Sequence, residues 1–175
     1  MTQLIGNKLT IAIEYEVTSQ APLMGHGRLW FEGQPLGSLE DLIYLDGYLL
    51  GCLEDLVKKP RLTQRYQHMD EQGLFLQLDG DLSSYDEEDS KDFSEQARPY
   101  FVTCGTLFDC YLVFSYRLDD VRGSIMWRLE GDIDDLPFND LKQASRADHF
   151  ATFEYAQLLT LISEFRTGLS QAGSR

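Results

Sequence analysis

Every second residue is apolar along several stretches of the chain, which is the pattern of a β-strand with one buried face. Residues 9–17 alternate in this way, and residues 28–32 are predicted as the next strand. A shorter alternation covers residues 74–78. The longest pattern, residues 108–118, is followed by a turn and by the apolar residues 125–129, so these two segments are predicted to form a hairpin. We therefore expect neighbouring strands to pair mainly in antiparallel fashion.

Two other stretches carry apolar residues three and four positions apart, the spacing of one helix face. The first runs from Asp46, a residue type that favours helix starts, to about Lys59, and Pro60 ends it. The second covers residues 154–169. With the strands, these helices predict an α+β fold: a mainly antiparallel sheet with two packed helices. The 175 residues suit a single domain, residues 1–175, with a sizeable core.

Residues 79–95, DGDLSSYDEEDSKDFSE, interrupt these patterns with a dense run of negative charge. Eight of the seventeen residues are acidic and only Lys91 is basic. Because few apolar residues are present to join a core, we predict an acidic loop or insert within the domain. Its carboxylates are the candidate partner-binding residues: Asp79, Asp81, Asp86, Glu87, Glu88, Asp89, Asp92 and Glu95.

The overall charge narrows the classes of partner. Lysine and arginine number 15 against 29 aspartate and glutamate residues, so the formal net charge is -14. Such a field repels phosphate groups, so neither direct nucleic-acid binding nor attachment to an anionic membrane is expected, whereas a basic protein surface is a suitable partner. The hydrophobic share of 43% and the charged share of 25% are typical of a folded globular protein.

The compartment is inferred from three features of the chain. Its start lacks the basic and apolar regions of a signal peptide. No segment approaches the roughly 18 consecutive apolar residues of a membrane span. The three cysteines have no repeated spacing and do not indicate a disulfide framework. We therefore expect a cytoplasmic protein.

Known catalytic and metal-binding motifs are not evident, so we predict no enzyme activity, no metal and no cofactor. The chain has no phosphate-binding glycine loop, no nucleophile elbow, no zinc-protease motif and no paired C-x-x-C. The acidic run starts like an EF-hand calcium loop, but Ser84 stands where that loop needs glycine and Ser90 where it needs glutamate. The histidines and cysteines are interpreted as ordinary surface or core residues: His26, His68, His149, Cys104 and Cys110.

Five segments, in their order along the chain, resemble the immunity protein 42 family. They supply an opening strand, an aromatic-rich strand with its glycine turn, a helix, a late hairpin and a closing helix. The segments are IGNKLTIAIEYEV, GRLWFEGQPLGSLED, LLGCLEDLV, FDCYLVFSYRLDDVRGSIMWR and FEYAQLLTLISEF. Residues 79–95 and 131–148 match no part of that family's pattern.

The resemblance implies a bacterial immunity protein of the cytosol, without catalytic residues. Such a protein binds and blocks the toxic C-terminal domain delivered by contact-dependent growth inhibition or a secretion system, and so protects the producing cell and its siblings. The acidic run would then dock on a basic toxin surface. Two alternatives remain open: a cytosolic adaptor for another basic protein, and a small hydrolase that uses a carboxylate with a histidine.

Overall fold

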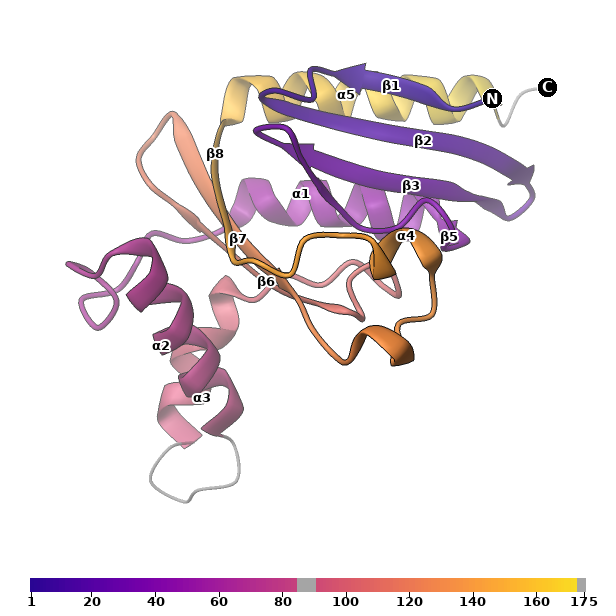
Figure 1. Cartoon of the computed structure of the whole chain (residues 1–175). Helices are drawn as coiled ribbons and strands as arrows, with labels where there is room; N and C mark the ends of the chain where they lie inside the picture. The colour runs from indigo at the N-terminus through magenta and orange to yellow at the C-terminus, as the bar shows by residue number, and fades with distance from the viewer. Residues whose placement is uncertain (85–90, 173–175) are drawn as a thin grey trace.

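Two antiparallel sheets lie at an angle to one another, with helices packed against both, in a computed structural model of the chain (Figure 1). The structure describes residues 1–84 and 91–172. The elements form one compact domain, which confirms the predicted α+β class and the antiparallel pairing. Two sheets occur where a single sheet was predicted. No helix within the described residues is long and apolar enough to cross a membrane.

The first sheet is built from the N-terminal quarter of the chain, in the order β1-β2-β3-β4, and β5 also pairs with β3. Its strands are β1 (Gln3–Gly6), β2 (Ile11–Gln20), β3 (Leu23–Phe31), β4 (Gln34–Leu36) and β5 (Ile43–Tyr44). The predicted strands at 9–17 and 28–32 correspond to β2 and β3. The register pairs Ile13 with Leu29 and Glu14 with Arg28, so apolar and polar residues lie on opposite faces.

The second sheet comes from the later part of the chain, in the order β6-β7-β8. Its strands are β6 (Tyr111–Arg117), β7 (Arg122–Leu129) and β8 (His149–Glu154). The predicted hairpin of residues 108–118 and 125–129 is confirmed as β6 and β7, which pair Val113 with Trp127. The third strand, β8, was not predicted, because it is short and leads directly into a helix.

Both predicted helices are present. The first begins as a π-helical turn, η1 (Leu45–Leu50), and continues as α1 (Gly51–Lys58), and the closing helix is α5 (Tyr155–Ala172). Both lie behind the first sheet (Figure 1). Shorter helical turns are η3 (Arg98–Tyr100), η4 (Ile133–Asp135) and α4 (Asn139–Lys142).

The prediction of a strand at residues 74–78 is wrong, because these residues lie inside α2 (Glu71–Ser83). Asp70 caps the helix by accepting a hydrogen bond from the backbone N–H of Gly73 at 2.7 Å. Phe75 and Leu78 are buried, whereas Leu76 is 53% exposed. Helical spacing thus places Leu76 away from the core, which the alternation of leucines in the sequence concealed.

The acidic stretch 79–95, predicted as a loop or insert, is helical in most of the part that the structure describes. Residues 79–83 form the last turns of α2, and residues 91–95 lie in α3 (Lys91–Ala97). Residues 85–90 lie outside the described residues. The misinterpretation arose because α2 buries only one narrow apolar stripe, so its polar side resembles a solvated loop in the sequence.

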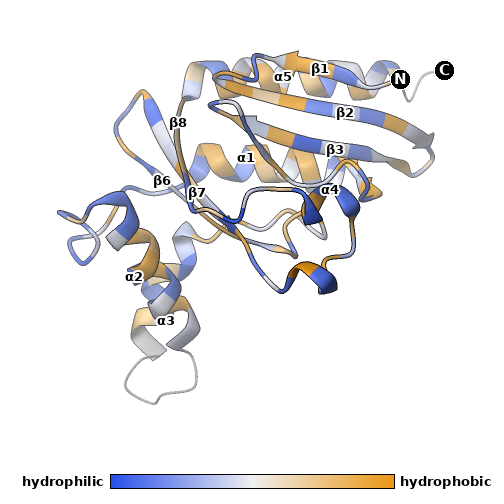
Figure 2. Ribbon diagram, viewed as in Figure 1, coloured by the Kyte–Doolittle hydropathy of each residue, from blue (hydrophilic) through white to orange (hydrophobic). Residues whose placement is uncertain are grey.

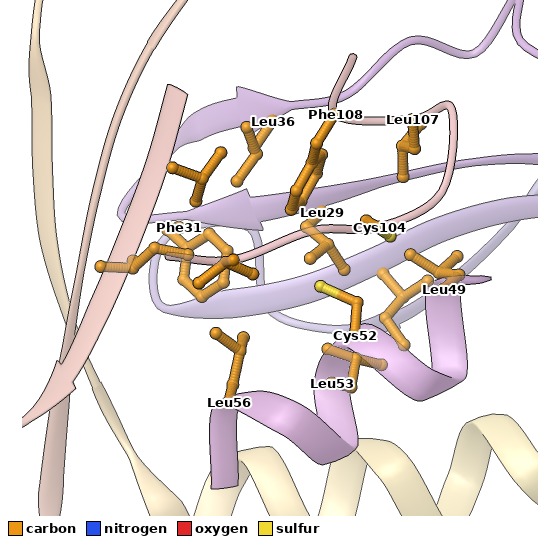
Figure 3. Packing of buried hydrophobic residues seen from close by; sticks show 14 of the residues in the cluster. Leu29, Phe31, Leu36, Leu49, Cys52, Leu53, Leu56, Cys104, Leu107 and Phe108 are labelled. Atoms are coloured by element: carbon orange, nitrogen blue, oxygen red, sulfur yellow. The ribbon is translucent and has the colours of Figure 1, made fainter. Parts of the chain in front are cut away.

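The second sheet forms the middle layer of the protein, because it is buried on both faces. On one face, Val113, Ile125 and Trp127 join the main core with the first sheet, α1 and α5. Figure 3 shows the part of this core where side chains of the first sheet face those of α1. Figure 2 shows apolar colour along α1, whose buried residues are part of this core. On the other face, Phe114 and Met126 join a second core with α2 and η3.

Candidate partner-binding surface

The described ends of the acidic stretch lie on a pair of helices, α2 and α3, that extends away from the two sheets (Figure 1). We name α2, α3 and the residues between them, 71–97, the acidic hairpin. Among the candidate partner-binding residues, Asp79 and Asp81 lie in α2, and Asp92 and Glu95 lie in α3. The others lie outside the described residues: Asp86, Glu87, Glu88 and Asp89.

Asp81 faces the protein interior and is only 5% exposed. Arg65 donates two hydrogen bonds to it, from Nε at 2.8 Å and from Nη2 at 2.9 Å. The hydroxyl of Tyr66 donates a third at 2.9 Å, and Nε2 of Gln77 a fourth at 2.8 Å. The prediction that Asp81 meets a partner is therefore corrected: its carboxylate holds α2 against the body of the protein.

The protonation states within this network follow from its hydrogen bonds. Burial by itself raises the pKa of Asp81, but the bonds from Arg65, Tyr66 and Gln77 outweigh it, and the pKa of Asp81 is lowered. Burial, together with the bond to Asp81, raises the pKa of the Tyr66 hydroxyl. At neutral pH the carboxylate of Asp81 is therefore charged and the hydroxyl of Tyr66 is neutral, so the hydroxyl can donate its hydrogen bond to the carboxylate.

Asp79 is likewise tied to the body, through Arg128 of β7. Nη2 of Arg128 lies 3.1 Å from Oδ2 of Asp79, and Nη1 lies 3.6 Å from Oδ1 of Asp148. The same guanidinium lies over the ring of Phe75, 5.1 Å from its centroid. Glu95, by contrast, is exposed and forms no ion pair with any residue that the structure describes. Two of the candidate carboxylates therefore anchor the hairpin, and Glu95 remains open to a partner.

Replacing Arg128 with methionine should lower the free energy of unfolding by about 1–2 kcal/mol, because it removes charged hydrogen bonds at the base of the hairpin. Urea unfolding measures the loss, and amide hydrogen exchange should show faster opening of α2. Arg122→Met is a matched control on the same strand, since the ion pair of Arg122 with Asp119 is exposed. The control should cost less than about 0.5 kcal/mol. Equal losses in both variants would show that Arg128 does not anchor the hairpin.

A second group of carboxylates lies on the loops at the start of β6 and after β7. All four are exposed, and none forms an ion pair with a described residue; we name them the loop carboxylates: Asp109, Asp132, Asp134 and Asp135. The backbone N–H of Glu130 donates to the carbonyl of Cys110 at 2.8 Å, which brings the two loops together. Negative charge without cation partners is thus not confined to the hairpin.

The outer face of the first sheet carries an ordered cluster of polar and aromatic side chains. Oε2 of Glu14 accepts hydrogen bonds from Nζ of Lys8 at 3.1 Å, Nε of Arg28 at 2.9 Å and Nε1 of Trp30 at 2.9 Å. Both cations also lie over the Trp30 ring, at 4.1 and 4.8 Å from its centroid. Tryptophan and arginine are enriched at binding hot spots. The period-two pattern could have identified this shared face, but sequence reasoning did not use it.

The three histidines occupy ordinary structural environments. Nδ1 of His26 lies 2.9 Å from the carbonyl of Asp41. His149 stacks on Trp127 at 5.1 Å between centroids, and burial lowers its pKa. His68 lies in a turn with φ of 68°. Within residues 1–84 and 91–172, no three His, Cys, Asp or Glu residues are grouped so that they could hold a metal ion.

The cysteines are mostly interior thiols. Cys52 of α1 and Cys104 are buried next to each other in the main core (Figure 3). The hydrogen bond with Cys52 and the burial raise the pKa of Cys104, and its Sγ donates to the carbonyl of Tyr48 at 3.4 Å. Burial also raises the pKa of the half-buried Cys110. A raised pKa keeps a thiol neutral and therefore a poor nucleophile.

No protein-family model matches the chain, and no curated protein or solved structure matches it significantly.

Proposed function

We propose that this protein is a cytoplasmic immunity protein, which binds a toxic protein domain with a basic surface and blocks it. The observation that carries the proposal is the excess of carboxylates that have no cation partner. Glu95 and the loop carboxylates are exposed and unpaired among the described residues. The sequence between α2 and α3 adds the run 86–89, DEED, to the acidic hairpin.

This charge arrangement suits a protein inhibitor of a basic enzyme. A toxin that acts on nucleic acid needs a positive cleft, and an acidic protein is attracted to that cleft by the same field as the substrate. Asp79 pairs with Arg128 of the second sheet, and Asp81 pairs with Arg65 in the segment before α2, so the remaining charge of the hairpin is presented from a fixed base. Presentation from a rigid scaffold lowers the entropic cost of binding.

The segments that resemble the immunity protein 42 family make up the frame of the fold. They cover the β1–β2 and β3–β4 regions, α1, the β6–β7 hairpin and the start of α5. The acidic hairpin and residues 131–148, which carry Glu95 and three of the four loop carboxylates, lie outside those segments. This division supports a common scaffold that carries an additional, partner-specific acidic surface.

The test is co-expression with the toxin domain that is encoded beside the gene. We expect growth to be restored and the two proteins to purify as one complex. Soluble protein that neither restores growth nor binds the toxin domain would reject the proposal. Binding without protection would favour an adaptor role instead.

A further inference from the structure

A groove runs between the β1–β2 turn and the first half of α5, at one end of the first sheet. It encloses about 400 Å³. Its floor is made by the buried side chains of Ile11 and Leu161, and its sides by Gly6 and by the exposed Ala156 and Thr160. The groove is therefore lined mainly by apolar atoms, although it opens to solvent.

A second groove of about 410 Å³ adjoins the first, because Thr10 and Gln157 line both. Its apolar lining comes from Phe153 of β8 and from Leu9, which is 75% exposed in the β1–β2 turn. We name the two together the turn–helix groove. Leu9 therefore adds apolar surface to that of the groove, and it is contiguous exposed apolar surface, not a single exposed leucine, that marks protein-binding sites.

The charged groups around the turn–helix groove leave it negative. Glu154 and Glu164 are exposed on its rim, and neither forms an ion pair with a residue in the described part of the chain. The cation that lines it, Arg122, is already held by Asp119, with Nε at 3.0 Å and Nη2 at 2.7 Å from Oδ2. A third carboxylate, Glu32, accepts a hydrogen bond from the backbone N–H of Thr152 at 2.9 Å.

We propose that the turn–helix groove binds a basic segment of the partner protein. An aliphatic side chain of that segment lies over Ile11 and Leu161, and flanking lysine or arginine side chains pair with Glu154 and Glu164. Charge complementarity selects this occupant, because the rim carries unpaired negative charge and the basic lining residue is neutralised. The partner's identity as a toxin domain rests on the proposed function, whereas the chemistry of the segment rests on the groove alone.

A peptide experiment tests the groove without any toxin. The probe is an acetylated heptapeptide of alternating lysine and leucine, and the control peptide carries glutamate in place of lysine. We expect the lysine peptide to shift amide resonances of Gly6, Asn7, Thr160 and Glu164 in a heteronuclear NMR titration, and the glutamate peptide to leave them unchanged. Shifts confined to the acidic hairpin, equal shifts with both peptides, or no shifts at millimolar peptide would overturn the proposal.

Two pairs of variants test the same groove for partner binding. Thr160→Trp fills it and should weaken peptide and toxin binding at least about ten-fold, whereas Ser163→Trp places the same side chain on an exposed part of α5 outside the groove lining. E154Q/E164Q should weaken binding up to about ten-fold at low salt, because two exposed pairs are lost. D134N/D135N removes the same charge outside the groove lining and should change affinity for the lysine peptide less than about two-fold.

The outcomes separate this proposal from the proposed function. If Thr160→Trp and E154Q/E164Q bind the peptide and the toxin domain as tightly as the wild-type protein does, the groove is not the binding site. The proposed immunity function would be unaffected by that result. The opposite result is that the protein fails to protect cells but binds the lysine peptide in the groove, and that these variants weaken the peptide binding. That result would reject the immunity function and support the groove as a binding site. Circular dichroism and urea unfolding of each variant show that a loss of binding is not a loss of folding.

Discussion

Replacing Asp81 with alanine should lower the free energy of unfolding by about 3 kcal/mol, a loss typical of a broken buried charge network. The change leaves the guanidinium of Arg65, the hydroxyl of Tyr66 and the amide of Gln77 without their shared acceptor. Tyr66 is fully buried, so its hydroxyl cannot turn to water. The penalty of an unsatisfied buried donor therefore adds to the lost hydrogen bonds.

Urea unfolding of the alanine variant measures this loss, with Asp134→Asn as the control for removing an exposed carboxylate. Asp81→Asn keeps the shape of the side chain and should lie between wild type and Asp81→Ala, because one amide oxygen can still accept. A loss below about 1 kcal/mol for Asp81→Ala would contradict the anchoring role, since typical surface changes stay within about 0.5 kcal/mol.

The pH dependence of the same variants gives an independent check. The pKa of Asp81 is lowered in the folded protein, so its contribution to stability is complete above the unfolded-state pKa of about 3.9. The contribution disappears as pH falls through the lower folded-state pKa. The stability difference between wild type and Asp81→Asn should thus be constant from pH 5 to 7 and shrink below about pH 4. A difference that persists at the lowest pH would show that the carboxylate charge is not its source.

Neutralising four carboxylates of the acidic hairpin should slow association with the toxin domain by about ten-fold or more at low salt. The variant is D86N/E87Q/E88Q/D89N, and it acts through the summed field of the hairpin. Individual exposed pairs contribute only about 0–1 kcal/mol each, so the dissociation rate should change less than the association rate. The free energy of unfolding should stay nearly unchanged.

The matched control removes the same charge from the loop carboxylates, as D109N/D132N/D134N/D135N. Association rates at about 50 and 300 mM salt compare the two, because the screening length differs more than two-fold between these conditions. We expect a flatter salt dependence for the hairpin variant than for the control. Identical rates and salt slopes in both variants would show that the net charge of the whole protein attracts the partner, and that the hairpin has no special role.

The sequence by itself determined the elements whose side-chain pattern has one clear period. β2, β3, the β6–β7 hairpin and the two helices at 46–59 and 154–169 each bury one face, so a local alternation of apolar and polar residues was sufficient. The expectation of a basic partner also came from composition alone, because a net charge of -14 acts at long range and does not depend on how the chain folds.

Only the tertiary structure decided what α2 is. Leu74, Leu76 and Leu78 fit a strand as well as a helix, and the second sheet settles the choice by offering its far face to Phe75, whose ring lies 5.6 Å from that of Phe114. The role of Asp81 depended on the fold in the same way, since Arg65 lies sixteen residues earlier in the chain.

The turn–helix groove could not be predicted from the sequence for a related reason. Its lining comes from the β1–β2 turn and, more than a hundred residues later in the chain, from β8 and α5. Local periodicity predicts which face of a strand or helix is buried, but it does not predict which other element covers that face. The sites that join distant segments therefore arise only when the sheets and helices pack together.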